Sequence, residues 1–139
     1  MESFSQNKAH SPNEGRTLVI MAKAPRPGAV KTRLAASFSP AAVADFYRCL
    51  LDDTLTLARS LGDVEVAIMC PGSDVNELER LTGNEANVVA QTGEGLAAGL
   101  TSVFAHFAAS GRQRVAAFNS DSPHLPRSVL EAAFETLAA

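Results

Sequence analysis

The distribution of apolar positions divides this chain into alternating strands and helices. Short apolar runs predict strands, and they lie at residues 16–23, 63–70, 87–90 and 114–118. Each run is followed by a segment with apolar residues at helical spacing or with helix-start signals, and these segments are 39–61, 74–81, 96–110 and 128–139. Such alternation favours an α/β, Rossmann-like fold with a mostly parallel sheet and helices on both faces.

The predicted helices have recognisable ends and apolar faces. Their starts are indicated by an N-cap serine before proline and by capping boxes, at Ser39–Pro40, Asp74–Glu77 and Ser128–Glu131. Gly62 is expected to end the first helix. The apolar faces are expected to include Val43, Phe46, Tyr47 and Leu50 in the first helix and Leu100, Val103, Phe104 and Phe107 in the third.

The composition narrows the class of protein. A chain of 139 residues with 46% hydrophobic and 19% charged residues suits one soluble globular domain. The net charge of −3 provides no general attraction to nucleic acid. Apolar runs stay far below the ~20 residues of a membrane span, so neither nucleic acid nor membrane insertion is expected. Because the amino terminus lacks the apolar core of a signal peptide, we expect a cytoplasmic location.

The amino terminus and the two cysteines lead to two further predictions. Residues 1–15 are polar and without periodicity, which predicts a disordered leader ahead of a domain at 16–139. Cys49 and Cys70 lie in apolar periodic segments and are predicted to be reduced thiols of the core.

A basic loop joins the first strand to the first helix. Its cations, prolines and glycine are Lys23, Pro25, Arg26, Pro27, Gly28, Lys31 and Arg33. Folded over the end of the strand, the cations would converge on a phosphate-bearing ligand, because Arg forks onto phosphate oxygens and Lys supplies a point charge. A solvated basic loop is the alternative. A nucleoside-triphosphate P-loop is excluded, because Pro25 and Val30 stand where that motif requires glycine.

Polar residues also follow the third and fourth strands. Ligands of open parallel sheets bind at the carboxyl ends of the strands, so these residues are expected near the basic loop. Asp121 could hold Mg²⁺ or Mn²⁺ through its carboxylate, or it could only cap its own turn. After the third strand, Gly93 and Gly95 would let backbone amides meet a phosphate or ribose at a helix start, although such turns also favour glycine for geometric reasons.

The basic loop resembles the amino-terminal signature of DUF2064, an uncharacterised transferase family with a GT-A (nucleotide-diphospho-sugar transferase) fold. The signature is matched at Lys23, Pro25, Pro27, Gly28, Val30, Lys31, Thr32, Arg33 and Leu34. The later Asp-x-Pro-x-Leu element of the family is matched at Asp121, Pro123 and Leu125, with His124 where the family has an acidic residue. The Gln-x-Gly element of the family is matched at Gln91 and Gly93.

The resemblance implies the nucleotide-binding half of a metal-assisted glycosyltransferase that uses a nucleotide-diphosphate sugar. The candidate nucleotide-binding residues are Lys23, Pro25, Arg26, Gly28, Lys31, Arg33, Gln91 and Gly93. Asp121 is the candidate ligand of a Mg²⁺ or Mn²⁺ cofactor, and no further catalytic residue is assigned.

The resemblance also bears on completeness and on alternative functions. Family members are longer, so we expect a shortened version that lacks the acceptor portion and forms a homo-oligomer or uses a partner that supplies the missing half. One alternative function is nucleotidyl transfer to a small phosphorylated acid. Another is a non-catalytic module for nucleotide binding or assembly. Release of nucleoside diphosphate, release of pyrophosphate, or binding without turnover distinguishes the three.

Overall fold

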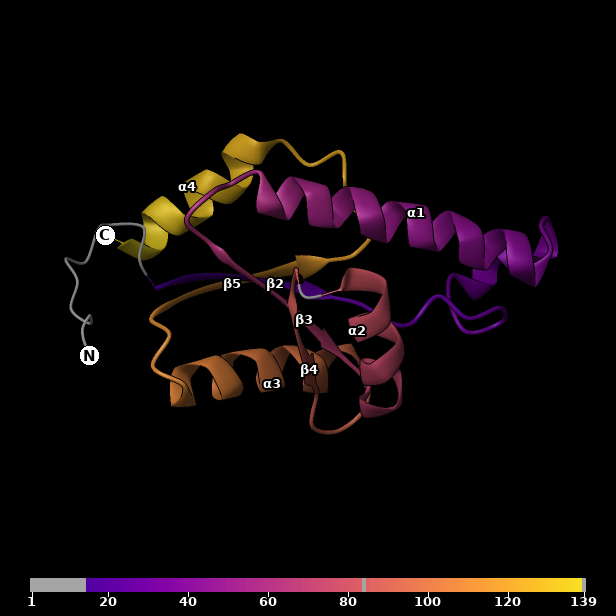
Figure 1. The fold of residues 1–139 in the computed structure, drawn as a ribbon, viewed down its shortest axis with the longest axis horizontal. Coiled ribbons are helices and arrows are strands. Elements are labelled where there is room, and N and C mark those ends of the chain that lie inside the picture. Colours follow the sequence, from indigo (N-terminus) through magenta and orange to yellow (C-terminus); the bar gives the residue numbers. More distant parts are fainter. Residues whose placement is uncertain (1–14, 84, 139) are drawn as a thin grey trace.

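The computed structural model describes residues 15–83 and 85–138, which form one sheet flanked by helices (Figure 1). The strands are β2 (Arg16–Met21), β3 (Glu65–Cys70), β4 (Asn87–Ala90) and β5 (Arg114–Asn119). They lie in the order β4-β3-β2-β5, and each neighbouring pair is parallel. The α/β prediction with a parallel sheet is therefore confirmed. The predicted leader lies, except for its last residue, outside the described residues.

Helices cover both faces of the sheet, also as predicted. The helices are α1 (Pro40–Arg59), α2 (Val75–Thr82), α3 (Gly95–Ala109) and α4 (Arg127–Ala138), with short 3-10 helices η1 (Thr32–Ala36) and η2 (Gly72–Asp74). Figure 1 shows α1 and α4 on one face and α3 on the other. Within the described ranges, no helix combines the length and the apolar character that crossing a bilayer requires.

Strand β2 is the centre of the core because both of its faces are covered. The residues from Thr17 to Ile20 have no exposed surface. Since successive side chains of a strand point to opposite faces, they join two different clusters. Leu18 and Ile20 pack in a cluster that contains Leu51, Leu55, Leu78 and Phe134 from the helices. Val19 packs in a second cluster with Val103 and Phe107 of α3.

The register aligns the carboxyl ends of all the strands at one edge of the sheet. Met21 of β2 lies opposite Met69 of β3 and Asn119 of β5, and Cys70 lies opposite Ala90 of β4. The strand order proceeds outward from β2 through β3 to β4, and then reverses so that β5 lies on the other side of β2. The switch point between β2 and β5 is the position where open α/β sheets bind ligands.

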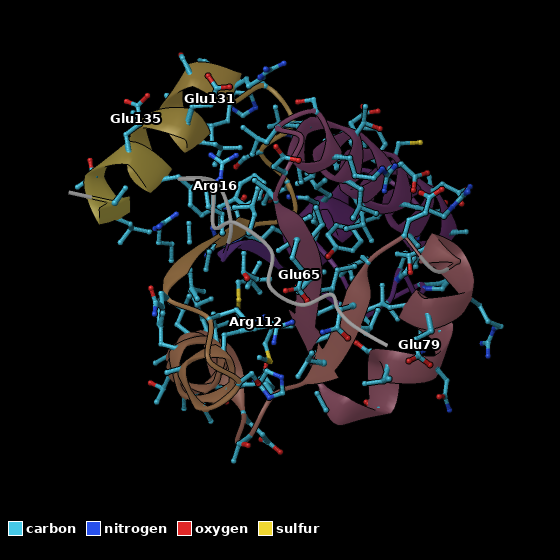
Figure 2. All side chains as sticks on the ribbon, turned by 60° about the vertical axis from the view of Figure 1, so that its left-hand side comes forward. Arg16, Glu65, Glu79, Arg112, Glu131 and Glu135 are labelled. Carbon is cyan, nitrogen blue, oxygen red and sulfur yellow. The ribbon has the colours of Figure 1, made fainter. Side chains whose placement is uncertain are left out.

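The opposite, amino-terminal edge of the sheet is closed by side-chain pairs. The Arg112 guanidinium donates to both carboxylate oxygens of Glu65, from Nε at 2.9 Å and from Nη2 at 3.0 Å. Figure 2 shows the labelled Arg112 and Glu65 side by side, with Arg16 near α4. The Arg16 guanidinium lies over the Phe134 ring, 5.2 Å from its centroid. These contacts join the strands and α4 at the edge that faces away from the switch point.

Several predicted details of the helices are confirmed or corrected. Ser39 caps α1 as predicted, its hydroxyl accepting from the Ala42 N–H at 3.1 Å, but the helix ends at Arg59 before the expected Leu61. Phe46 and Phe104 were expected on apolar faces, but they are 51% and 49% exposed. The buried stripes of these helices are narrower than the sequence pattern, since one face of each helix meets the sheet.

Three further expectations are wrong. Asp74 precedes α2 but makes no side-chain cap, because its carboxylate points to the loop after β2. Ser128 does not precede α4, because the helix already begins at Arg127. Cys49 is exposed on α1, whereas Cys70 is buried as predicted.

Candidate functional site

A cavity of about 560 Å³ opens at the carboxyl ends of the strands. Its walls come from all the segments that leave this edge of the sheet. They include Met21 at the end of β2 with Lys23 and Lys31 after it, Met69 of β3 with Pro71 after it, Gln91, Gly93 and Leu96 after β4, and Asn119 at the end of β5 with Ser120 after it. The volume falls within the roughly 300–1,000 Å³ of small-molecule sites. The cavity therefore brings together the segments that the sequence singled out.

Lys31 and Asp121 form an ion pair across the switch point. The Lys31 Nζ lies 2.6 Å from Asp121 Oδ2, and the side chains are 26% and 35% exposed. Lys31 is the only non-glycine residue with positive φ in the described ranges, at φ 45° and ψ 47°. Left-handed backbone is costly for a residue with a side chain, and such outliers gather at functional sites. The pair joins the basic loop to the loop that carries Asp121 after β5, called here the acidic loop, as expected from their positions after β2 and β5.

The backbone of Lys31 is fixed by packing on the residue before it. Val30 is 5% exposed and packs against Ala44 and Tyr47 of α1. Immediately after Lys31, the chain enters η1, and the Leu34 N–H donates to the Lys31 carbonyl at 2.9 Å. The loop therefore holds the Lys31 backbone from both sides, and its ammonium points toward Asp121.

Tyr47 of α1 links the basic loop to the segment after β5. Its hydroxyl accepts from the Lys23 N–H at 3.0 Å and is hydrogen-bonded to Ser120 Oγ at 2.7 Å. Thr54 lies about two turns further along the same face of α1, and its hydroxyl donates to the Ser120 carbonyl at 3.0 Å. Burial raises the pKa of Tyr47, so its hydroxyl keeps its proton. The sequence pattern placed Tyr47 in an apolar face, and nothing in the local sequence pointed to Ser120, which lies 73 residues away.

Arg26 faces away from the cavity walls and toward acidic residues. Its Nη1 pairs with Asp74, its Nε lies 3.0 Å from Glu77, and its Nη2 donates to the Ser73 carbonyl at 3.1 Å. Asp74, only 5% exposed, also accepts from the Ala24 N–H at 2.9 Å. This cluster ties the basic loop to the segment after β3. Sequence reasoning missed it, because Asp74 also fitted a capping box.

The amide of Gln91 shapes the side of the cavity next to α3. Its Nε2 donates to the carbonyls of Gly93 at 3.1 Å and Gly95 at 3.2 Å. Gly93 has φ +80°, a conformation that suits glycine. Glu94, the N-cap residue of α3, makes no side-chain cap, and Gly95 and Leu96 at the start of the helix line the cavity. The start of α3 thus lies at the cavity wall, and helix starts are common anion-binding sites.

The predicted site residues fall into two groups. Lys23, Lys31, Gln91 and Gly93 line the cavity, and Asp121 joins them through its pair with Lys31. Pro25, Arg26, Gly28 and Arg33 lie outside the cavity lining. Gly28 has φ +81° in the turn closed by the Ala29 N–H and the Arg26 carbonyl at 3.0 Å. Nucleotide contacts by this second group stay predictions.

Asp121 fits one mode of divalent-cation binding. In the described ranges, no group of three His, Cys, Asp or Glu side chains is placed to hold a metal ion. Mg²⁺ is often bound by one or two carboxylates, with water and substrate phosphates as the other ligands. The Asp121 carboxylate is partly exposed at the cavity and suits that mode, whereas His124 is exposed in the following turn.

Comparison with solved structures defines the class to which this fold belongs. The chain matches the crystal structure of a "putative nucleotide-diphospho-sugar transferase" from Desulfovibrio desulfuricans G20, with a TM-score of 0.78 and 25% identity. The match covers 88% of this chain and 54% of that chain, so the chain spans about half of its length. The fold is therefore that of nucleotide-diphospho-sugar transferases, in agreement with the GT-A expectation.

The family follows from the sequence. The chain belongs to DUF2064, described as "Uncharacterized protein conserved in bacteria", whose family model matches residues 54–139. The resemblance found in the sequence is thus confirmed. The matched range contains Gln91, Gly93 and Asp121 and begins after the basic loop. No curated protein matched the chain.

Proposed function

We propose that this chain is the nucleotide-binding part of a metal-assisted glycosyltransferase that uses a nucleotide-diphosphate sugar. The observation that carries the proposal is the meeting of Lys31 and Asp121 at the switch point of the sheet. Lys31 of the cavity wall pairs with Asp121 from a separate loop, and a diphosphate needs such a cation while its divalent counter-ion needs such a carboxylate. The fold shared with the solved transferase supports the proposal.

Different residues of the cavity bind different parts of the ligand. Lys23 and Lys31 hold the diphosphate, together with N–H groups at the start of α3. Gln91 and Gly93 form the wall that contacts the nucleoside, and Asp121 holds Mg²⁺ or Mn²⁺. Such a cation neutralises charge on phosphate oxygens. The lysines act mainly by electrostatic stabilisation of the departing nucleoside diphosphate.

The first experiment measures binding. Isothermal titration and thermal shift are carried out with the diphosphates of adenosine, guanosine, cytidine, uridine and thymidine, with Mg²⁺, with Mn²⁺ and with EDTA. A ligand at 100 times its dissociation constant stabilises the fold by about 2.7 kcal/mol, which is easily measured. Lys31→Ala and Asp121→Ala are expected to weaken metal-dependent binding at least tenfold. Arg48→Ala on the outer face of α1 is the control, since Arg48 lies 3.7 Å from Asp45 and away from the cavity.

The second experiment follows products, because binding and turnover are separate questions for a chain that spans 54% of its solved relative. Glycosyl transfer releases a nucleoside diphosphate from the bound nucleotide sugar. Pyrophosphate release from a nucleoside triphosphate would replace this proposal with nucleotidyl transfer. Tight binding without either product would assign a binding module, and a folded sample that binds no nucleotide would refute the proposal.

A further inference from the structure

We propose that Lys31 serves as an internal cation for Asp121 in the free protein, so that the nucleotide diphosphate and the divalent cation bind cooperatively. The inference rests on the proposed function and adds the regulation of the same site. In the free protein, Lys31 occupies the carboxylate that the divalent cation needs, and Asp121 occupies the ammonium that the diphosphate needs. Binding of either ligand breaks the pair and thereby frees the group that the other ligand binds.

The contacts of the pair support this exclusivity. Within the described ranges, the Lys31 ammonium makes one hydrogen bond, to Asp121 Oδ2 at 2.6 Å. A cation that takes this carboxylate must displace the ammonium, and a diphosphate that takes the ammonium must detach it from the carboxylate. The other lysine of the cavity differs, because Lys23 is exposed and its backbone, not its ammonium, is held by Tyr47.

The backbone shows that the pair is imposed by the fold. Lys31 is held in the left-handed region between the anchored Val30 and the start of η1. A free lysine on a loop would relax to a common conformation, since left-handed backbone costs free energy. On the opposite side, Ser120 is held by Tyr47 and Thr54, which fixes the residue next to Asp121. Both members are therefore positioned to meet before any ligand arrives.

The pair couples the two ligands through a free-energy cycle. When one ligand binds alone, the pair is broken and one charged group loses its partner at a partly buried position. When both bind, the pair is broken once and each member gains a new partner. Coupling between two ligands is reciprocal, so each must raise the affinity for the other by the same factor. We expect a factor of about five from the pair, at the lower end for coupled sites, because both side chains are partly exposed.

Cooperativity in the wild type does not test the pair alone, because Mg²⁺ also binds phosphate directly. The decisive measurements use one ligand and one unpaired member. Mn²⁺ alone is titrated into wild type and Lys31→Met, and inorganic pyrophosphate is titrated in EDTA into wild type and Asp121→Asn. Each variant removes one charge of the pair while keeping a side chain of similar size. Circular dichroism and urea denaturation confirm that both variants fold.

Both variants are expected to gain affinity for one ligand, which a general loss of function would not produce. Lys31→Met should bind Mn²⁺ about five times more tightly than wild type, and Asp121→Asn should bind pyrophosphate about five times more tightly. Lys23→Met is the matched control: it loses a lysine of the same cavity that does not pair with Asp121. It should weaken pyrophosphate binding and change Mn²⁺ affinity less than twofold.

Unchanged or weaker Mn²⁺ binding in Lys31→Met would overturn the inference, and so would unchanged or weaker pyrophosphate binding in Asp121→Asn. An equal gain of Mn²⁺ affinity in Lys23→Met would overturn it as well, since the effect would then be the general charge of the cavity. Failure of the proposed function is seen separately, as absence of nucleotide binding by the wild type across the diphosphate panel.

Discussion

The cluster around Asp74 leads to a quantitative prediction about the basic loop. Asp74→Ala removes the carboxylate that accepts from the Ala24 N–H at 2.9 Å and pairs with Arg26. Asp74 is 5% exposed and Ala24 is 1% exposed, so water cannot easily replace the carboxylate at this N–H. We expect the substitution to destabilise the fold and to loosen the loop that carries Lys31.

The size of the effect follows from the two contacts. A hydrogen bond from a buried N–H to a charged acceptor contributes about 1.5–3 kcal/mol. The pair with Arg26 adds little, because the Arg26 side chain is 42% exposed and its charge is screened. Asp74→Ala should therefore lower the free energy of unfolding by about 1.5–3 kcal/mol. Arg26→Ala should lower it by less than Asp74→Ala does, since water then reaches the Asp74 carboxylate.

Urea denaturation followed by circular dichroism provides the measurement. With a slope of about 2 kcal/mol/M, in the middle of the usual range, the midpoint of Asp74→Ala should fall by about 0.8–1.5 M relative to wild type. Asp53→Ala is the control, because Asp53 is exposed on α1. A loss for Asp74→Ala no larger than that of Asp53→Ala, or smaller than that of Arg26→Ala, would refute the reasoning. Arg26→Ala also tests its predicted phosphate role, which requires a loss of nucleotide affinity beyond the loss of stability.

Three more predictions concern the core and the walls of the cavity. Tyr47→Phe removes the hydroxyl bonded to Ser120 and should lower the free energy of unfolding by about 1–2 kcal/mol in urea denaturation. Burial raises the pKa of Cys70 from 9.0 to about 11, so the protonated thiol is favoured in the folded state. The raised pKa of this thiol contributes to the free energy of unfolding fully below pH 9, and this contribution is lost as the pH rises to about 11. Urea midpoints across that pH range should therefore fall less in Cys70→Ala than in wild type. Gly99→Ala places a Cβ 2.9 Å from Gln91 Oε1, and isothermal titration should show weaker nucleotide binding, while melting is little changed because alanine favours helix.

The elements of this fold could be predicted because their signals are local. The run around β2 is apolar at successive positions, as expected of a strand covered on both faces. Ser39 followed by Pro40 fixed the start of α1. The alternation of strands and helices then led to a parallel sheet, and the rule on strand ends placed the basic and acidic loops together.

The contacts that organise the site could not be predicted, because they join distant residues. Asp74 bonds Ala24 across 50 positions, and Tyr47 bonds Ser120 across 73 positions. Both residues also had a local explanation, a capping box for Asp74 and an apolar helix face for Tyr47. Phe46 and Phe104 show the converse, since helical spacing alone does not say how wide a face the sheet covers.

The position of β5 next to β2 also determines when the cavity is made. Strands β2, β3 and β4 are complete once Ala90 has been synthesised, but Asp121 lies 90 positions after Lys31 and follows the last strand. Until β5 arrives, one side of β2 has an unpaired edge that other chains could join. Parallel pairing between strands so far apart in the sequence is slow, because the entropy of closing the long loop is lost before the pairing contacts are gained. The cavity is therefore complete only once β5 has paired with β2, since Asn119 and Ser120 form part of its wall.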